Sequence, residues 1–156
     1  MAFCRWLSRR LNKTVRLPDE WEWQCAATGG DPTRTYPWGS KWNPKQETHR
    51  ANTFESHLRE TTAVGMFPAG VSLAGPYDMA GSVWEWCLNK YENPEITESR
   101  KDDLEPRVVR GGSWSYDQDF AKCANRYWDR PTLRFYSFGF RVVCTSVVSD
   151  GLSLQT

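Results

Sequence analysis

Two short strings, Arg110-Gly111-Gly112-Ser113-Trp114 and Gly139-Phe140-Arg141-Val142-Val143, flank the most informative part of the chain. Nine of the 27 residues from Trp114 to Phe140 are aromatic, whereas the 14% aromatic content of the whole chain predicts about four. An excess of this kind indicates rings that fill a core or rings that are displayed to a partner. The three bulky rings within residues 135–138 cannot all face one side of an extended segment, which favours the display of at least one of them.

Two helices are expected near the N-terminus. Residues 2–11 place their apolar side chains near one helical face and their arginines elsewhere, which predicts an amphipathic helix. Asp19 is followed three residues later by Glu22, a pattern typical of a capping box, and Gly29-Gly30 supplies a stop signal. We therefore expect a second helix over residues 20–28.

Beyond these helices the chain predicts much irregular structure. Proline and glycine interrupt residues 31–75 and divide them into loops and short extended pieces, while residues 92–106 form a charged, solvated loop. Strands are expected over residues 107–110 and over residues 138–145. The second of these should close the fold by pairing back on Val108-Val109.

The bulk composition narrows the class of protein. At 156 residues the chain has the size of one domain, which we expect to span residues 1–145 and to be followed by a tail over residues 146–156. A net charge of +1 gives no broad attraction to nucleic acid or anionic membrane. No stretch approaches the roughly 20 apolar residues of a membrane span and no signal-peptide pattern is present, so a soluble, cytoplasmic protein is expected. The five cysteines are scattered, which predicts neither a zinc site nor a disulfide framework.

Several groups of residues, read in order along the chain, carry a family resemblance. They are Ala2-Phe3-Cys4-Arg5-Trp6-Leu7, Arg16-Leu17-Pro18-Asp19-Glu20-Trp21-Glu22-Trp23, Tyr36-Pro37-Trp38-Gly39, Tyr77-Asp78-Met79-Ala80-Gly81-Ser82-Val83-Trp84-Glu85-Trp86, and the two flanking strings quoted above. Together they resemble the formylglycine-generating-enzyme/sulfatase-modifying-factor domain, a branch of the C-type lectin fold, over most of residues 2–144. The resemblance implies an α+β, C-type lectin-like fold with two helices, small antiparallel sheets and much irregular loop. Domains of that family begin with strands ahead of the first helix, so the N-terminal strands are expected to be missing or shortened here.

The same resemblance bears on catalysis. Formylglycine-generating enzymes bind copper with a pair of cysteines just after the Gly-Gly-Ser-aromatic string, but Ser115 and Tyr116 stand where the first cysteine should be. Cys123 alone cannot supply two thiolates, and a lone cysteine is more often a small buried apolar residue. Sulfoxide-synthase relatives need an iron-binding histidine cluster, whereas this chain has only His49 and His57. We therefore expect no enzyme activity and no required cofactor; the alternatives are a copper-dependent oxidase and a non-catalytic structural relative.

The segment between the flanking strings also resembles the C-terminal variable region of diversity-generating-retroelement proteins, whose lectin-type fold holds a diversified ligand-binding surface. In that group a template rich in asparagine codons is copied with mutation of its adenines, so framework residues persist while the asparagine positions vary. The match leaves eleven expected variable positions: Ser115, Tyr116, Asp117, Phe120, Tyr127, Asp129, Arg130, Leu133, Phe135, Tyr136 and Ser137. Trp114, Phe138 and Phe140 are expected in the core.

The residue types at these positions suit recognition. Tyrosine offers a large, rigid contact area, and serine and aspartate offer adaptable hydrogen bonds. Aromatic residues at the centre of an interface can each be worth about 2 kcal/mol or more, and Tyr116, Tyr127, Phe135 and Tyr136 are the candidates. A large exposed aromatic patch implies a ligand that covers it. We expect a macromolecule, preferably a protein; neither its identity nor the oligomeric state follows from the sequence.

A structural calcium ion is a further expectation of the resemblance. By the match to the calcium loop of the formylglycine-generating family, Asp78 and Glu85 would give carboxylates, and Gly81 and Val83 would give backbone carbonyl oxygens. Oxygen ligands of this kind suit a hard cation. The alternative is a capped turn in which Glu85 pairs with an arginine and the neighbouring tryptophans pack inward.

Overall fold

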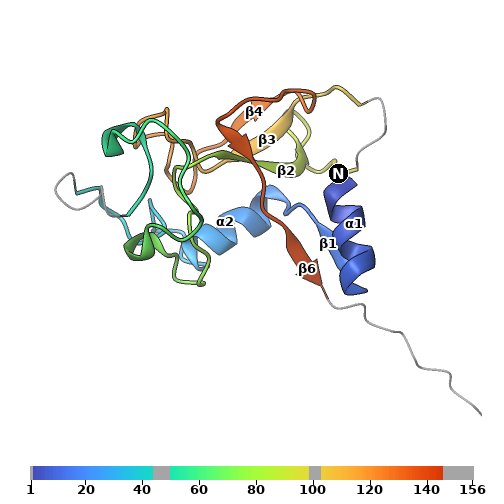
Figure 1. Cartoon of the computed structure of the whole chain (residues 1–156), viewed down its shortest axis with the longest axis horizontal. Coiled ribbons are helices and arrows are strands. Elements are labelled where there is room, and N and C mark those ends of the chain that lie inside the picture. Colours follow the sequence, from blue (N-terminus) through green and yellow to red (C-terminus); the bar gives the residue numbers. More distant parts are fainter. Residues whose placement is uncertain (1, 44–49, 99–102, 146–156) are drawn as a thin grey trace, which may run out of the picture.

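The computed structural model describes residues 2–43, 50–98 and 103–145, so the tail expected over residues 146–156 lies outside the described residues. The two helices are α1 (Ala2–Leu11) and α2 (Glu20–Thr28), as the periodicity of residues 2–11 and the capping signals around residues 20–28 predict. Two short 3-10 helices, η2 (Phe54–Ser56) and η3 (Pro68–Gly70), interrupt the long loops. Figure 1 shows α1 at one end of the molecule, the loops at the other, and α2 between them.

The predicted capping signals form at both ends of α2. The Glu22 amide donates to Asp19 Oδ1 at 2.8 Å, and Glu22 Oε2 accepts from the Asp19 amide at 2.9 Å, which completes the capping box. Gly29 ends the helix in the left-handed region with φ of 66°. These contacts fix the start and the direction of α2, which carries part of the core.

In the described part of the chain, six strands form two sheets. The larger sheet has the order β4 (Tyr127–Asp129), β3 (Arg107–Arg110), β2 (Trp84–Lys90) and β5 (Phe138–Gly139). β3 is antiparallel to both of its neighbours, whereas β5 is parallel to β2. β1 (Thr14–Arg16) and β6 (Val143–Thr145) form a separate antiparallel pair beside α1 (Figure 1).

The expected closing strand over residues 138–145 is wrong in its partner and its continuity. β4 occupies the free edge of β3, with Val109 opposite Tyr127 and Val108 opposite Trp128. The 138–145 segment instead divides into β5, which joins β2, and β6, which joins β1. β4 lies closer to β3 along the chain than residues 138–145 do, and it pairs with the edge of β3. The alternation of apolar and polar residues in one strand does not determine which of two later segments becomes its partner.

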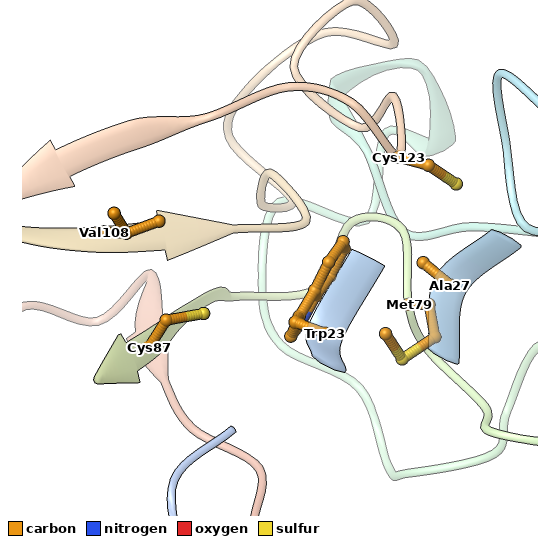
Figure 2. Packing of buried hydrophobic residues seen from close by; sticks show 6 residues of the cluster. All are labelled: Trp23, Ala27, Met79, Cys87, Val108 and Cys123. Carbon is orange, nitrogen blue, oxygen red and sulfur yellow. The ribbon is translucent and has the colours of Figure 1, made fainter. Parts of the chain in front are cut away.

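The core joins α2 to the larger sheet. A cluster of buried residues from α2, β2, β3 and two loops packs around Trp23; it consists of Trp23, Ala27, Met79, Cys87, Val108 and Cys123. Figure 2 shows the Trp23 ring between the strands that carry Cys87 and Val108 and the side chains of Ala27 and Met79. Burial of this ring fixes the distance between α2 and the sheet, and so positions the loops that follow β3.

Gly81 gives the first prediction for stability. Its φ is 75°, and a Cβ atom at this position would lie 2.2 Å from the backbone oxygen of Asn52. Gly81→Ala should cost about 1–3 kcal/mol from backbone conformation alone, and the clash with Asn52 adds to that cost. Chemical denaturation measures the loss.

Gly75→Ala is the matched control, because Gly75 has φ of 101° but nothing within 4 Å of its Cβ position. Equal losses for the two variants would contradict a role for the close approach to Asn52.

Candidate functional site

Three of the predicted variable side chains surround one buried ring. Trp84 at the start of β2 is fully buried. Its ring centroid lies 5.6 Å from that of Tyr116, 6.1 Å from that of Phe120 and 5.6 Å from that of Tyr127. Tyr116 and Phe120 are half-buried, whereas Tyr127 is 41% exposed. We call these four residues the Trp84 cluster; its buried ring supports three rings that reach the surface.

A second group of rings lies on the segment after β4. The centroids of Phe135 and Tyr136 are 4.1 Å apart, and Tyr136 lies 5.4 Å from Trp114. Phe135 is 50% exposed and Tyr136 is 62% exposed, whereas Trp114 is half-buried. The expectation that part of the 135–138 segment is displayed is therefore confirmed.

Backbone contacts hold the loop from Ser115 to Phe120 in place. The amide of Phe54 donates to the carbonyl of Tyr116 at 2.9 Å, and the amide of Gln118 donates to Glu55 Oε1 at 3.0 Å. The Asn125 side-chain amide donates to the carbonyl of Phe120 at 3.1 Å. These bonds use main-chain atoms of the loop, so they do not depend on which side chains stand at positions 116, 118 and 120.

Phe54 is an exposed aromatic residue beside this surface that the sequence analysis missed. It lies in the loop-rich part of the chain, 60 or more positions from the variable segment, and no local pattern links the two. Only the hydrogen bond between Phe54 and Tyr116 brings it to the edge of the Trp84 cluster.

The other variable positions add polar groups around the rings. Asp117 and Arg130 are exposed, and Ser115, Asp129 and Leu133 are half-buried. The two aspartates accept hydrogen bonds from nearby amides: Asp117 Oδ1 from Asp119 at 2.9 Å, and Asp129 Oδ1 from Arg130 at 2.7 Å. Both carboxylates therefore stabilise local turns as well as facing solvent.

Two expectations about individual positions are wrong. Ser137 is only 1% exposed, so it does not lie on the displayed surface; it directly precedes β5, and its carbonyl accepts from the Trp84 amide at 2.8 Å. Phe140 is 48% exposed instead of buried in the core, because it lies between β5 and β6 and contacts the ring of Phe3 at 5.4 Å. Trp114 and Phe138, also expected in the core, are half-buried.

A network of charged side chains, largely buried, holds the residue just before β4. Arg126 Nε donates to Glu20 Oε2 at 2.6 Å, and the Arg126 guanidinium lies 4.4 Å from the Tyr91 ring centroid. Arg110 lies 3.9 Å from the same Glu20 carboxylate and donates to Gln24 at 2.6 Å. Burial lowers the pKa of Arg110 below its ordinary value. The network joins α2 to the framework residues next to Tyr127.

The thiol beside the flanking string is buried and hard to ionise. Cys123 is buried in the core cluster, and burial raises the pKa of its thiol to about 12. Burial also raises the pKa of the Cys87 thiol. A copper pair of thiolates does not fit these residues, because Ser115 and Tyr116 supply no sulfur and Cys123 is protonated at neutral pH.

These burials predict the reactivity of the thiols. Cys25 and Cys144 are exposed, whereas Cys4, Cys87 and Cys123 are buried. Ellman's reagent at pH 8 should therefore modify two thiols quickly in the native protein and the other three only after denaturation. A third fast thiol that disappears in a Cys123→Ser variant would contradict the inert state of Cys123.

Both carboxylates that are expected to bind calcium accept hydrogen bonds from protein groups. Glu85 Oε2 accepts from Arg141 Nε at 2.5 Å and from Trp23 Nε1 at 2.6 Å, and Glu85 Oε1 accepts from Arg141 Nη2 at 2.8 Å. Asp78 Oδ2 accepts from the Gly65 amide at 2.7 Å. With a guanidinium on both oxygens of Glu85, the set of Asp78, Gly81, Val83 and Glu85 does not fit a calcium ion in this arrangement.

Within residues 2–43, 50–98 and 103–145, no three histidine, cysteine, aspartate or glutamate side chains are grouped so that they could hold a metal ion. No helix in the described part of the chain is long and apolar enough to cross a membrane.

Several known proteins are similar to this chain in sequence. The family model for the sulfatase-modifying factor enzyme 1-like domain matches residues 1–146. Serine/threonine-protein kinase Pkn1 from Chlamydia trachomatis serovar L2 is 37% identical over 134 residues, which cover 81% of this chain and 20% of the kinase. Inactive C-alpha-formylglycine-generating enzyme 2 from Bos taurus is 31% identical over 151 residues, which cover 90% of this chain and 45% of that protein. The chain thus spans less than half of each of these relatives.

A solved structure is similar as well. Variable protein 1 from Treponema denticola superposes with a TM-score of 0.68 at 27% identity, over 83% of this chain and 47% of that chain. The likeness agrees with the C-type lectin-like fold, formylglycine-generating-enzyme subtype, expected from the ordered strings.

Proposed function

This chain belongs to the family of sulfatase-modifying factor enzyme 1-like domains, and on that premise we propose that it is a ligand-binding protein that presents residues 115–137 as a diversified surface. The observation that carries the proposal is the exposure of Tyr127, Phe135 and Tyr136 at expected variable positions. Their neighbours Trp84 and Trp114 belong to the framework strings. Rings of the framework strings therefore support rings at the expected variable positions.

The likeness to a protein named variable protein 1 supports the same proposal. A diversity-generating retroelement would change the codons of the surface positions and leave the framework codons intact. The contacts of the 115–120 loop suit such a process, since they run through the carbonyls of Tyr116 and Phe120 and the amide of Gln118. A new side chain at position 116 or 120 leaves those bonds in place.

The ligand is a macromolecule, and a protein is the class that we favour. Tyr127, Phe135 and Tyr136 expose large aromatic rings, two of them with a hydroxyl group, and Asp117 and Arg130 add charges of both signs around them. Tyrosine-rich surfaces with adaptable polar neighbours are typical of antibody paratopes, which bind protein epitopes. Central rings of this kind would supply the hot spots of the interface.

A library tests whether the surface can vary without loss of the fold. Ten positions, the expected variable set without the buried Ser137, are encoded by asparagine codons whose adenines are randomised. Most members of the library should unfold cooperatively, with a denaturation midpoint close to that of the parent protein. Members that bind a chosen folded protein such as a lysozyme should be recoverable by a display selection. A library in which most members are unfolded, or a folded library that yields no binders, would overturn the proposal.

The control library randomises ten framework positions of the core and its surroundings, including Trp23, Met79 and Val108. Most of its members should be unfolded, because core substitutions leave cavities or bury polar groups. Equal tolerance in the two libraries would remove the distinction between framework and display.

An oxidase of the formylglycine-generating type is the second candidate, favoured by the family match over residues 1–146. The buried Cys123 thiol and the residues Ser115 and Tyr116 argue against it, and one relative with this domain is itself named inactive. Copper-dependent oxygen consumption with a sulfatase-motif peptide, abolished in Cys123→Ser, would establish the oxidase. Absence of turnover would leave the binding proposal.

A further inference from the structure

A cavity of about 520 Å³ lies between α1, β2, β5 and the segment that follows β4. Its walls are mostly apolar. Phe3 comes from α1, Trp86 from β2 and Phe138 from β5, while Leu133 and Phe135 come from the segment between β4 and β5. Cavities of roughly 300–1,000 Å³ with apolar walls and few polar groups are typical of small-molecule sites. This cavity is distinct from the Trp84 cluster, since Trp84, Tyr116, Phe120 and Tyr127 do not line it.

The charge around the cavity is positive. None of its fifteen described lining residues is acidic, and two of them are arginines. Arg107 is committed to the protein, because its guanidinium contacts Asp103 Oδ2 at 2.7 Å, the Glu98 carbonyl at 2.6 Å and the Leu88 carbonyl. Its charge is therefore already balanced.

Arg134 is the cation that remains for a ligand. Arg134 is an exposed residue of the cavity lining, and its Nη1 donates to the carbonyls of Pro131 at 3.1 Å and Leu133 at 2.9 Å, which restrains the guanidinium beside its own segment. Within the described part of the chain, its Nε and Nη2 have no hydrogen-bond partner and no acidic side chain pairs with it. A guanidinium held in this way presents its remaining donors for a carboxylate.

We infer that this cavity binds an amphipathic carboxylate, a molecule with an elongated apolar body that lies among the rings and one terminal carboxylate that pairs with Arg134. The apolar walls provide the affinity for the apolar body of the ligand, since burial of apolar surface is favourable. The single cation selects an anion over a neutral or cationic molecule with the same body. Leu133 and Phe135 line this cavity and also belong to the expected variable positions. Binding needs only the side chains that this chain carries, so a failure of the proposed diversification would not remove the site.

Three probes with the same alkyl chain test the choice of charge. Dodecanoate, dodecanol and dodecyltrimethylammonium are titrated into the full chain by calorimetry at concentrations below micelle formation. Dodecanoate should bind at least tenfold more tightly than dodecyltrimethylammonium. Equal affinities of the anion and the cation would overturn the inference.

Two arginine substitutions test the partner of the carboxylate. Arg134→Gln should weaken dodecanoate binding about tenfold and leave dodecanol binding unchanged. Arg130→Gln is the matched control, because Arg130 is exposed on the same segment but does not line this cavity. Loss of dodecanoate affinity in both variants, or in neither, would contradict a specific pairing with Arg134.

Bromine quenching tests the location of the apolar body. Bromine quenches tryptophan fluorescence on contact, and Trp86 lines the cavity, so 12-bromododecanoate should quench the native protein. Trp86→Phe should retain the calorimetric affinity and lose most of the quenching, whereas Leu133→Trp should narrow the cavity and weaken dodecanoate binding. Quenching that persists in Trp86→Phe, or a dodecanoate affinity that is unchanged in Leu133→Trp, would place the ligand elsewhere and refute the site.

Discussion

Replacement of Trp84 by alanine is expected to destabilise the protein by about 3–5 kcal/mol, the usual cost of removing a fully buried tryptophan ring. Trp84 is fully buried and is the shared contact of Tyr116, Phe120 and Tyr127. Removal of its ring would leave a cavity under the loop and strand that carry those side chains. Denaturation in urea measures the loss, which is a large share of the roughly 5–15 kcal/mol available to a folded domain.

Two control variants distinguish the role of the buried Trp84 ring from that of the exposed rings that pack on it. Trp84→Phe should cost much less, because it retains a ring and loses no hydrogen bond: Trp84 Nε1 has no partner within the described part of the chain. Tyr127→Ala should cost less still, because Tyr127 is 41% exposed. A Tyr127→Ala variant as unstable as Trp84→Ala would show that Tyr127 belongs to the core and would contradict its place on the display surface.

Glu85→Ala is expected to cost about 3–5 kcal/mol, because it breaks a buried ion pair by removing one partner. The buried Glu85 carboxylate accepts from Arg141 Nε and Nη2 and from Trp23 Nε1. Its loss would leave a partly buried guanidinium and a buried indole N–H without their acceptor. Urea denaturation, read by the fluorescence of the tryptophans, reports the change.

Glu105→Ala is the matched control for this charge. Glu105 accepts from Lys90 Nζ at 2.6 Å, but the Glu105 side chain is largely exposed. Its removal should cost under about 1 kcal/mol, as is usual for an exposed ion pair. If Glu85→Ala were no more costly than Glu105→Ala, the Arg141 contact would not be part of the stable core, and the calcium alternative at Glu85 would regain its basis.

The sequence predicts the local features of this fold well. α1 follows from apolar periodicity, and α2 with its bounds follows from Asp19, Glu22 and Gly29, since these signals act within a few residues. Strand pairing was predicted less well. The partner of β3 depends on which of two later segments reaches its edge, and the residues of a single strand do not record that competition.

The exposure of single residues in the variable segment was also predicted only in part. The exposure of Phe135 and Tyr136 was predictable because adjacent rings cannot all be buried on one side of an extended chain. The burial of Ser137 and the exposure of Phe140 were not, because both depend on the division of the 138–145 segment between two sheets. Phe54 also required the fold, since it meets the variable segment only through a contact distant in sequence.

The most direct test of a diversified surface is the sequence of the DNA that flanks the gene. We predict a reverse transcriptase and a near-identical template copy of the segment that encodes residues 110–143. The copy should differ from the gene only where the template has adenine, and the differences should fall at the codons of the exposed and half-buried positions such as Tyr116, Tyr127 and Tyr136. Flanking DNA that contains neither a reverse transcriptase nor such a copy would contradict diversification of this surface.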